Sequence, residues 1–74
     1  MRVGPYRLAF YRSNGTEPPH VHVISGTGQA KFWLDPVSVA QSRGFRSHQL
    51  SRVRMLVIEN RVEFLEAWHA HFGN

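Results

Sequence analysis

The chain has 74 residues and no cysteine, so it forms one domain near the smallest size that folds unaided, without disulfides or thiolate metal ligands. Its 42% hydrophobic content excludes a disordered segment, and because no apolar leader follows Met1 and no apolar run could cross a bilayer, we expect a cytoplasmic protein. The net charge is +4, and the positive charge is concentrated in residues 1–54, which hold eight Lys and Arg against two acids. This excess either attracts phosphates or an acidic protein, or it is ordinary surface charge.

Residues 1–46 have the pattern of an antiparallel sheet. Alternation over residues 6–12 predicts a first strand, which ends at the turn-forming residues 13–16. Strands over 20–25 and 29–34, joined by a short link that contains two glycines, predict a hairpin. Residues 37–42 fit either a fourth strand or one turn of helix, and we prefer the strand.

The most distinctive segment of this sheet is the run Pro-Pro-His-Val-His-Val at residues 18–23. The prolines donate no backbone hydrogen bond, so strand pairing begins at or after His20. Strict alternation then puts Val21 and Val23 on the face that enters the core and His20 and His22 on the other. Two exposed imidazoles side by side suit metal ligation, acid–base catalysis or contact with an anionic partner, and they also occur on solvated strand faces.

Residues 47–72 are predicted to form one long helix, with Ser47 as its N-cap and Gly73 where it stops. The main apolar positions of this segment fall on one stripe when each residue turns the helix by about 100°. The stripe should cover one sheet face and form the core with it, using Leu50, Val53, Leu56, Val57, Phe64, Trp68 and Phe72 from the helix and Tyr6, Leu8, Phe10, Val21, Val23, Ala30, Phe32 and Leu34 from the strands.

Two further features of the helix are not needed for this core. Met55, Ile58 and Val62 form a second apolar strip, which predicts an interface with another subunit or a partner protein, unless loops or the fourth strand cover it. Arg61 lies within the main stripe, where we expect its side chain to reach solvent or to pair with Asp35 or Glu17.

Three segments of the chain resemble a family of small bacterial and mobile-element proteins known as domain of unknown function 4160. They are residues 18–23, residues 30–36 (Ala-Lys-Phe-Trp-Leu-Asp-Pro) and residues 64–73 (Phe-Leu-Glu-Ala-Trp-His-Ala-His-Phe-Gly). Members of this family are often found beside a second small protein and are regarded as toxin–antitoxin components. The resemblance therefore implies a partner protein, and it implies no chemistry.

The sheet face away from the helix is predicted to carry basic and aromatic side chains, namely Arg7, Tyr11, His20, His22, Lys31 and Trp33. Aromatic rings on an open sheet stack on unpaired bases while Arg and Lys hold phosphates, so this face suits RNA. The alternative is that Trp33 and Tyr11 pack against the C-terminus or a protein partner, and we prefer a protein contact to an RNA contact.

An enzymatic interpretation uses the same residues. His20 or His22 could act as general base and acid, with Tyr11 and Arg7 stabilising the transition state of metal-independent RNA cleavage. No hydrolase, P-loop or dinucleotide-binding motif is present.

We expect neither a metal ion nor a cofactor, although His20 and His22 could contribute to a metal site. They supply only two ligands, and His69 and His71 differ by about 200° around a helix, so both cannot face one ion. A site that adds His71 and Asp35 to the strand pair is conceivable, and nothing in the sequence requires it.

We therefore predict a single α+β domain over residues 1–74, with three or four antiparallel strands in residues 1–46 and one helix over 47–72 packed on one face. We expect a binding module of a toxin–antitoxin-like or mobile-element system, without contact to a membrane. It would pair through Met55, Ile58 and Val62, with a small partner protein, a second copy or both, and present the opposite sheet face to a protein or RNA. The alternative is a metal-independent ribonuclease toxin that uses His20 and His22.

Overall fold

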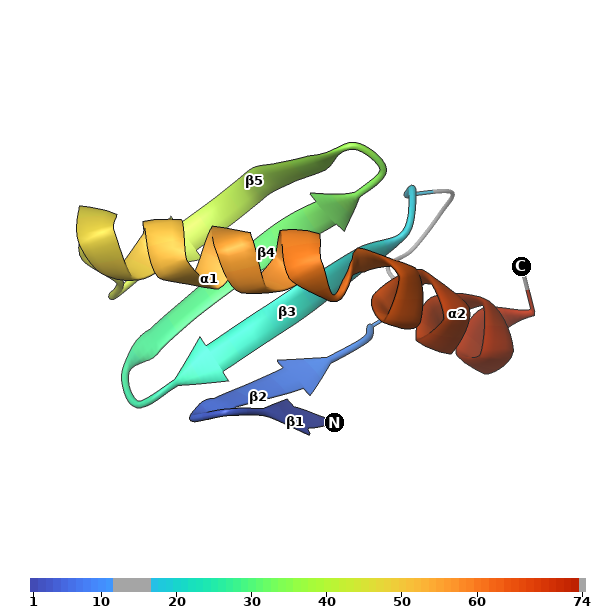
Figure 1. The fold of residues 1–74 in the computed structure, drawn as a ribbon, viewed down its shortest axis with the longest axis horizontal. Helices are drawn as coiled ribbons and strands as arrows, with labels where there is room; N and C mark the ends of the chain where they lie inside the picture. Colours follow the sequence, from blue (N-terminus) through green and yellow to red (C-terminus); the bar gives the residue numbers. More distant parts are fainter. Residues whose placement is uncertain (12–16, 74) are drawn as a thin grey trace.

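The structure, a computed structural model, describes residues 1–11 and 17–73. It confirms the α+β class and contains a five-stranded sheet in which each strand pairs antiparallel with the next along the chain (Figure 1). The strands are β1 (Arg2–Val3), β2 (Tyr6–Ala9), β3 (His20–Ser25), β4 (Gly28–Leu34) and β5 (Val37–Arg43). The prediction of three or four strands is wrong, because β1 has two residues and is too short to produce an alternating pattern.

Tight connections join the last three strands. The β3–β4 turn contains Gly26 at a φ of 57°, and a Cβ atom on Gly28 would lie 2.6 Å from the Phe45 ring, so this position needs glycine. Asp35 and Pro36 form the β4–β5 turn. Residues 37–43 form β5, which confirms the preferred strand, and the predicted turn at 13–16 lies outside the described residues together with Arg12.

The helical segment is divided into α1 (Ser47–Glu59) and α2 (Arg61–Phe72), so the prediction of one long helix is wrong. Asn60 lies between them with φ −108° and ψ 16°, and its side-chain Nδ2 donates a hydrogen bond of 2.8 Å to the Leu56 carbonyl. An asparagine that bonds a carbonyl four residues back competes with the regular helical bonds, which accounts for the break. The N-cap is Arg46 rather than Ser47, and Gly73 ends α2 in the left-handed conformation, as predicted.

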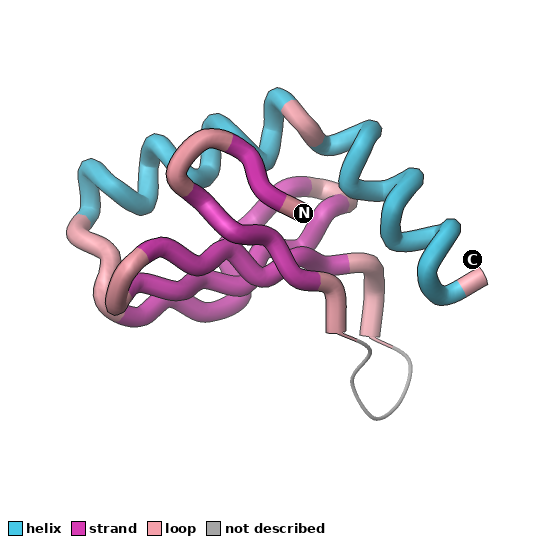
Figure 2. Tube along the Cα trace, turned by 90° about the horizontal axis from the view of Figure 1, so that it is seen from below, coloured by secondary structure: helices cyan, strands magenta, loops and turns pink. Residues whose placement is uncertain are grey.

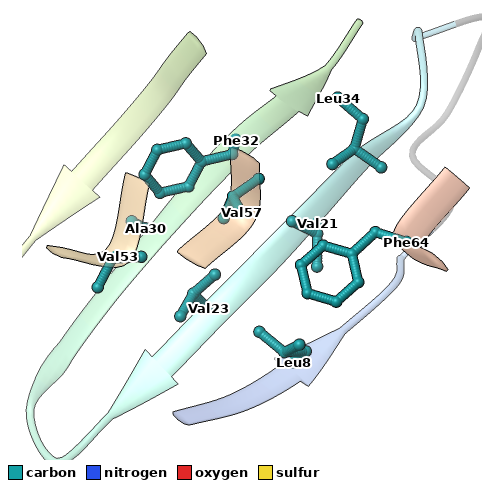
Figure 3. Packing of buried hydrophobic residues seen from close by; sticks show 9 residues of the cluster. All are labelled: Leu8, Val21, Val23, Ala30, Phe32, Leu34, Val53, Val57 and Phe64. Atoms are coloured by element: carbon teal, nitrogen blue, oxygen red, sulfur yellow. The ribbon is translucent and has the colours of Figure 1, made fainter. Parts of the chain in front are cut away.

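The predicted core is confirmed on both sides of the interface (Figure 3). The fully buried side chains include Val21, Val23, Phe32 and Leu34 from the sheet, and Val53, Val57 and Phe64 from the helices. Tyr6, Phe10, Leu50 and Leu56 are half-buried at its margin. The helices and strands therefore meet through the apolar stripe and the sheet face that the alternation assigned to them.

Both helices lie on the same side of the sheet (Figure 2). α1 crosses above the strands, and after the bend at Asn60 α2 descends past the end of the sheet (Figures 1 and 2). No helix of the described chain covers the other sheet face, which we call the open face.

Candidate functional site on the open sheet face

Strand register places most of the predicted site residues on the open face. His22 pairs with Lys31, which pairs with Gln41, so these three side chains form one row across β3, β4 and β5. His20, Trp33 and Ser38 form the next row by the same pairing. A bulge at Ala40 separates the two rows on β5, because Phe32 pairs with Val39 and Lys31 with Gln41.

His20 is buried, which contradicts the expectation of an exposed imidazole. Its side chain is 1% exposed, and its ring lies 4.8 Å from the Trp68 ring, measured between centroids. The Nδ1–H of His20 donates to the Pro18 carbonyl oxygen at 2.9 Å, so the ring is held from both sides. The bend at Asn60 brings α2 past the end of the sheet (Figure 2), and the Trp68 ring on this helix covers His20, the first residue of β3.

Four of the other predicted site residues contact one another: Tyr11, which follows β2, His22 on β3, and Lys31 and Trp33 on β4. The Tyr11 ring stands edge-on to the His22 ring with centroids 4.8 Å apart, and Tyr11 is 55% exposed. The Lys31 Nζ atom lies 4.6 Å from the centre of the Trp33 ring, which is a cation–π distance. Tyr11, His22, Lys31 and Trp33 therefore form a continuous cluster that reaches the surface.

Glu17 balances part of the positive charge of this cluster. Its Oε1 atom lies 2.6 Å from the Lys31 Nζ atom, and the side chain of Lys31 is only 13% exposed. The same Oε1 atom is 3.8 Å from Nδ1 of His20, beyond hydrogen-bond range. The ammonium group of Lys31 is thus directed towards Glu17 and Trp33.

Arg7 is separate from the cluster. It pairs with Ile24, one row away from His22, and it is exposed. The register continues that row through Gln29 to Arg43 on β5. The open face therefore has an aromatic cluster towards one end of the strands and a guanidinium row towards the other.

Burial lowers the pKa of His22 below its ordinary value of 6.5. The charges of His20 and Lys31 lower this pKa further, while Glu17 acts in the opposite direction. A lowered pKa keeps the imidazole neutral at neutral pH, so that it can accept a proton or a hydrogen bond.

A hollow of about 460 Å³ lies next to His22 on this face. Its lining includes Gln29, Gln41 and Arg43 together with Lys31, and these residues come from β3, β4 and β5. The residues that the sequence analysis assigned to this face include Lys31 and His22, but not Gln29, Gln41 or Arg43. Gln29 alternates with buried neighbours on β4, and this was the available signal for it. Gln41 and Arg43 had no such signal, because no residue of β5 is buried and the bulge interrupts the alternation of that strand.

The second predicted surface lies on the outer side of the helices. Met55, Ile58 and Val62, which we call the apolar strip, are 54%, 43% and 63% exposed. They stand on both sides of the break at Asn60, so the strip follows the convex bend between α1 and α2 (Figure 2). No described loop and no strand buries them, which leaves the strip available to a partner.

Arg61 has the structural partner that the sequence suggested. Its Nη2 atom lies 2.6 Å from Oδ1 of Asp35, and its Nε–H donates to the Leu34 carbonyl at 2.7 Å. The guanidinium thus connects the start of α2 to the end of β4. It takes no part in the open face.

The described residues contain no group of three His, Asp or Glu side chains arranged to hold a metal ion. Neither α1 nor α2 combines the length and apolar content of a membrane-spanning helix.

Comparison with known proteins gives one match. No curated protein and no solved structure matches the chain. A family model described as Domain of unknown function (DUF4160) matches residues 6–69, which include β2 to β5, all of α1 and most of α2. The chain therefore belongs to the DUF4160 family.

Proposed function

We propose that this domain is a small RNA-binding module that works as one component of a two-component, toxin–antitoxin-like system. The observation that carries the proposal is the cluster of Tyr11, His22, Lys31 and Trp33 on a sheet face that no described helix covers. Rings on such a face stack on unpaired bases, and each stacked base contributes about 1–3 kcal/mol.

Charge favours RNA over an acidic protein segment on this face. Arg7 on β2 and Arg43 on the edge strand β5 lie in one row across the sheet, and both are exposed. Lys31 adds a third cation, and Glu17 is its nearest carboxylate. A row of separated guanidinium groups matches the repeated phosphates of an extended strand.

A partner protein is assigned to the apolar strip on the other side of the molecule. Three exposed apolar side chains close together in the chain, two on α1 and one on α2, are typical of a protein contact. The family resemblance implies a neighbouring small protein, which supports this part of the proposal. The two surfaces would allow RNA and the partner protein to bind at the same time.

The proposal is tested by fluorescence anisotropy with a short, labelled single-stranded RNA. We expect affinity to fall as salt rises, because phosphate contacts release counterions, and we expect the duplex of the same sequence to bind more weakly. Tyr11→Ala should weaken binding about tenfold, the effect of about 1.4 kcal/mol of lost stacking, and Arg7→Gln should reduce the salt dependence. The matched control is Arg52→Gln on the exposed side of α1. Equal binding by all variants, or no binding at low salt, contradicts the proposal.

One observation supports a second candidate, a metal-independent ribonuclease. The lowered pKa of His22 provides a neutral imidazole that could take the proton of a ribose hydroxyl group, with Arg43 nearby to hold the phosphate. His20 is too buried to touch a substrate, so His22 would act without it. Incubation with RNA distinguishes the two candidates, since an enzyme yields cleavage products that His22→Ala abolishes, whereas a binding module returns the strand intact.

A further inference from the structure

The hollow beside His22 is lined by side chains that can donate and accept hydrogen bonds. Gln29 and Gln41 each carry an amide, which offers both a donor and an acceptor, and Arg43 carries a guanidinium with several donors. Within the described chain, these three side chains form no hydrogen bond or ion pair with another residue. They are therefore free to bind a ligand.

The charges around the hollow are arranged asymmetrically. The Lys31 ammonium is engaged by Glu17 and lies over Trp33, so Lys31 contributes little free charge to the hollow. Arg43 is then the one free cation in the described lining, and its register partner is Gln29. One cation beside two amides fits a ligand with one anionic group and one polar, uncharged part.

We propose that this hollow binds a single nucleotide, with the Arg43 guanidinium on its phosphate and the amides of Gln29 and Gln41 on the edge of its base. The proposal rests on the proposed RNA-binding function and deepens it, because it assigns one position of the strand to one site. The volume of about 460 Å³ lies within the range of pockets that hold small molecules.

The residues beside the hollow provide a position for the next nucleotide of an RNA strand. His22 lines the hollow and also contacts the Tyr11 ring, so a base stacked on Tyr11 neighbours the nucleotide in the hollow. The neutral His22 ring can accept a hydrogen bond from the ligand. The hollow therefore fits one nucleotide of a longer strand as well as a free mononucleotide.

The test is titration of the isotope-labelled full chain with adenosine monophosphate and uridine monophosphate, followed by NMR of the backbone amides. We expect saturable shifts at Gln29, Gln41, Arg43 and their neighbours on β3–β5, with adenosine alone and inorganic phosphate alone binding more weakly at the same residues. Arg43→Met should weaken mononucleotide binding at least about tenfold, because a charge-assisted hydrogen bond is lost, and Gln41→Met should weaken it less. Arg52→Met, an exposed arginine on α1, is the matched control and should change nothing.

The outcomes separate this inference from the proposed function. Single-stranded RNA that binds equally to wild type and Arg43→Met, without mononucleotide shifts in the hollow, overturns the nucleotide site and leaves RNA binding by the open face in place. Mononucleotide binding in the hollow without binding of longer RNA supports the site and overturns the proposed function. Shifts confined to residues outside β3–β5 overturn the site.

Discussion

Lys31 connects three features of the open face through a single ammonium group. It is paired with Glu17, it lies over the Trp33 ring, and its charge contributes to the lowered pKa of the neighbouring His22. An anionic ligand on this face must therefore compete with Glu17 for Lys31. In the proposed RNA complex, the carboxylate of Glu17 would take the place of a phosphate beside Lys31 and would limit the attraction of this face for RNA.

Replacing that carboxylate should strengthen RNA binding. In Glu17→Gln the ammonium of Lys31 becomes available, and one negative charge is removed near the strand. The expected gain is about fivefold in affinity, the effect of about 1 kcal/mol for a charge pair in a high dielectric. Anisotropy with the single-stranded RNA measures it, with Glu59→Gln on α1 as the control. Unchanged or weaker binding in Glu17→Gln would show that Lys31 does not contact RNA.

The lowered pKa of His22 predicts a pH dependence of folding stability. The unfolded chain protonates His22 as the pH falls below about 6.5, whereas the folded chain does so only at lower pH. The unfolded state therefore binds more protons in this window, and the free energy of unfolding decreases as the pH falls through it. At pH values well above 6.5, His22 is neutral in both states and does not make the free energy of unfolding depend on pH.

The measurement compares denaturant unfolding of wild type and His22→Gln at several pH values, together with an NMR titration of the His22 ring. We expect the stability of wild type relative to the variant to fall below pH 6.5, and the ring to titrate below 6.5. A ring that titrates at or above that value contradicts the assigned burial of His22.

For individual residues, the sequence predicted which side chains share a sheet face but not which of them are buried. Alternation alone placed His22, Lys31 and Trp33 on the open face, and the register confirms this. His20 obeys the same alternation and is nevertheless buried, because Trp68 comes from an element far along the chain. Periodicity carries no information about such a long-range contact.

The division of the helical segment into α1 and α2 determines how the secondary-structure elements pack. Buried apolar positions continue from Val53 to Trp68 on both sides of Asn60, so periodicity predicted one helix. In the structure the Asn60 side chain bonds the Leu56 carbonyl, which accounts for the break. The break lets α1 follow the sheet and α2 turn towards its end. Without it, Trp68 would have no position over His20.

Arg61 should stabilise this turn. Its two bonds, to the Leu34 carbonyl and to Asp35, connect the first residue of α2 with the end of β4. We expect Arg61→Met to lower the free energy of unfolding by about 1–2 kcal/mol, most of it from the bond to the half-buried carbonyl, because the ion pair with Asp35 is solvent-exposed. Arg52→Met is the control and should stay within about 0.5 kcal/mol of wild type in denaturant unfolding. Equal stability of the two variants would mean that packing alone fixes α2.

The strands differ in how well their pattern identified them. β3 and β4 follow strict alternation and were predicted to within one residue. β5 alternates only up to Ala40, where the bulge shifts its register by one residue. The sequence of residues 37–42 was therefore compatible with either a strand or a turn of helix. β1 is two residues long, below the length at which any period can be recognised.

Within the part of the chain that the structure describes, two surfaces on opposite sides of the molecule are left uncovered. The core lies between the helices and the sheet, the open face is directed away from the helices, and the apolar strip is directed away from the sheet. A ligand on one surface therefore leaves the other accessible. This arrangement suits a module that connects a nucleic acid with a protein.

The shape of the apolar strip constrains its partner. The strip holds three side chains at a convex bend, whereas a stable interface between two proteins buries about 800 Å² on each partner. Two convex surfaces placed together contact over a small area only. We therefore expect the isolated chain to be a monomer in dilute solution, as measured by light scattering. A partner protein with a concave apolar groove can surround the strip more fully.

The strip can be tested by changing its side chains without changing the fold. In Met55→Gln and Ile58→Gln, both on the exposed side of α1, the free energy of unfolding should stay within about 0.5 kcal/mol of wild type for each substitution. Capture of the protein encoded by the neighbouring gene, in a co-expression experiment, should fall at least about tenfold, because apolar contacts at the centre of an interface carry most of its energy. Val39→Thr changes an exposed apolar residue on β5 and is the matched control. RNA binding should persist in every one of these variants, and a joint loss of RNA and partner binding would mean that the two surfaces do not act independently.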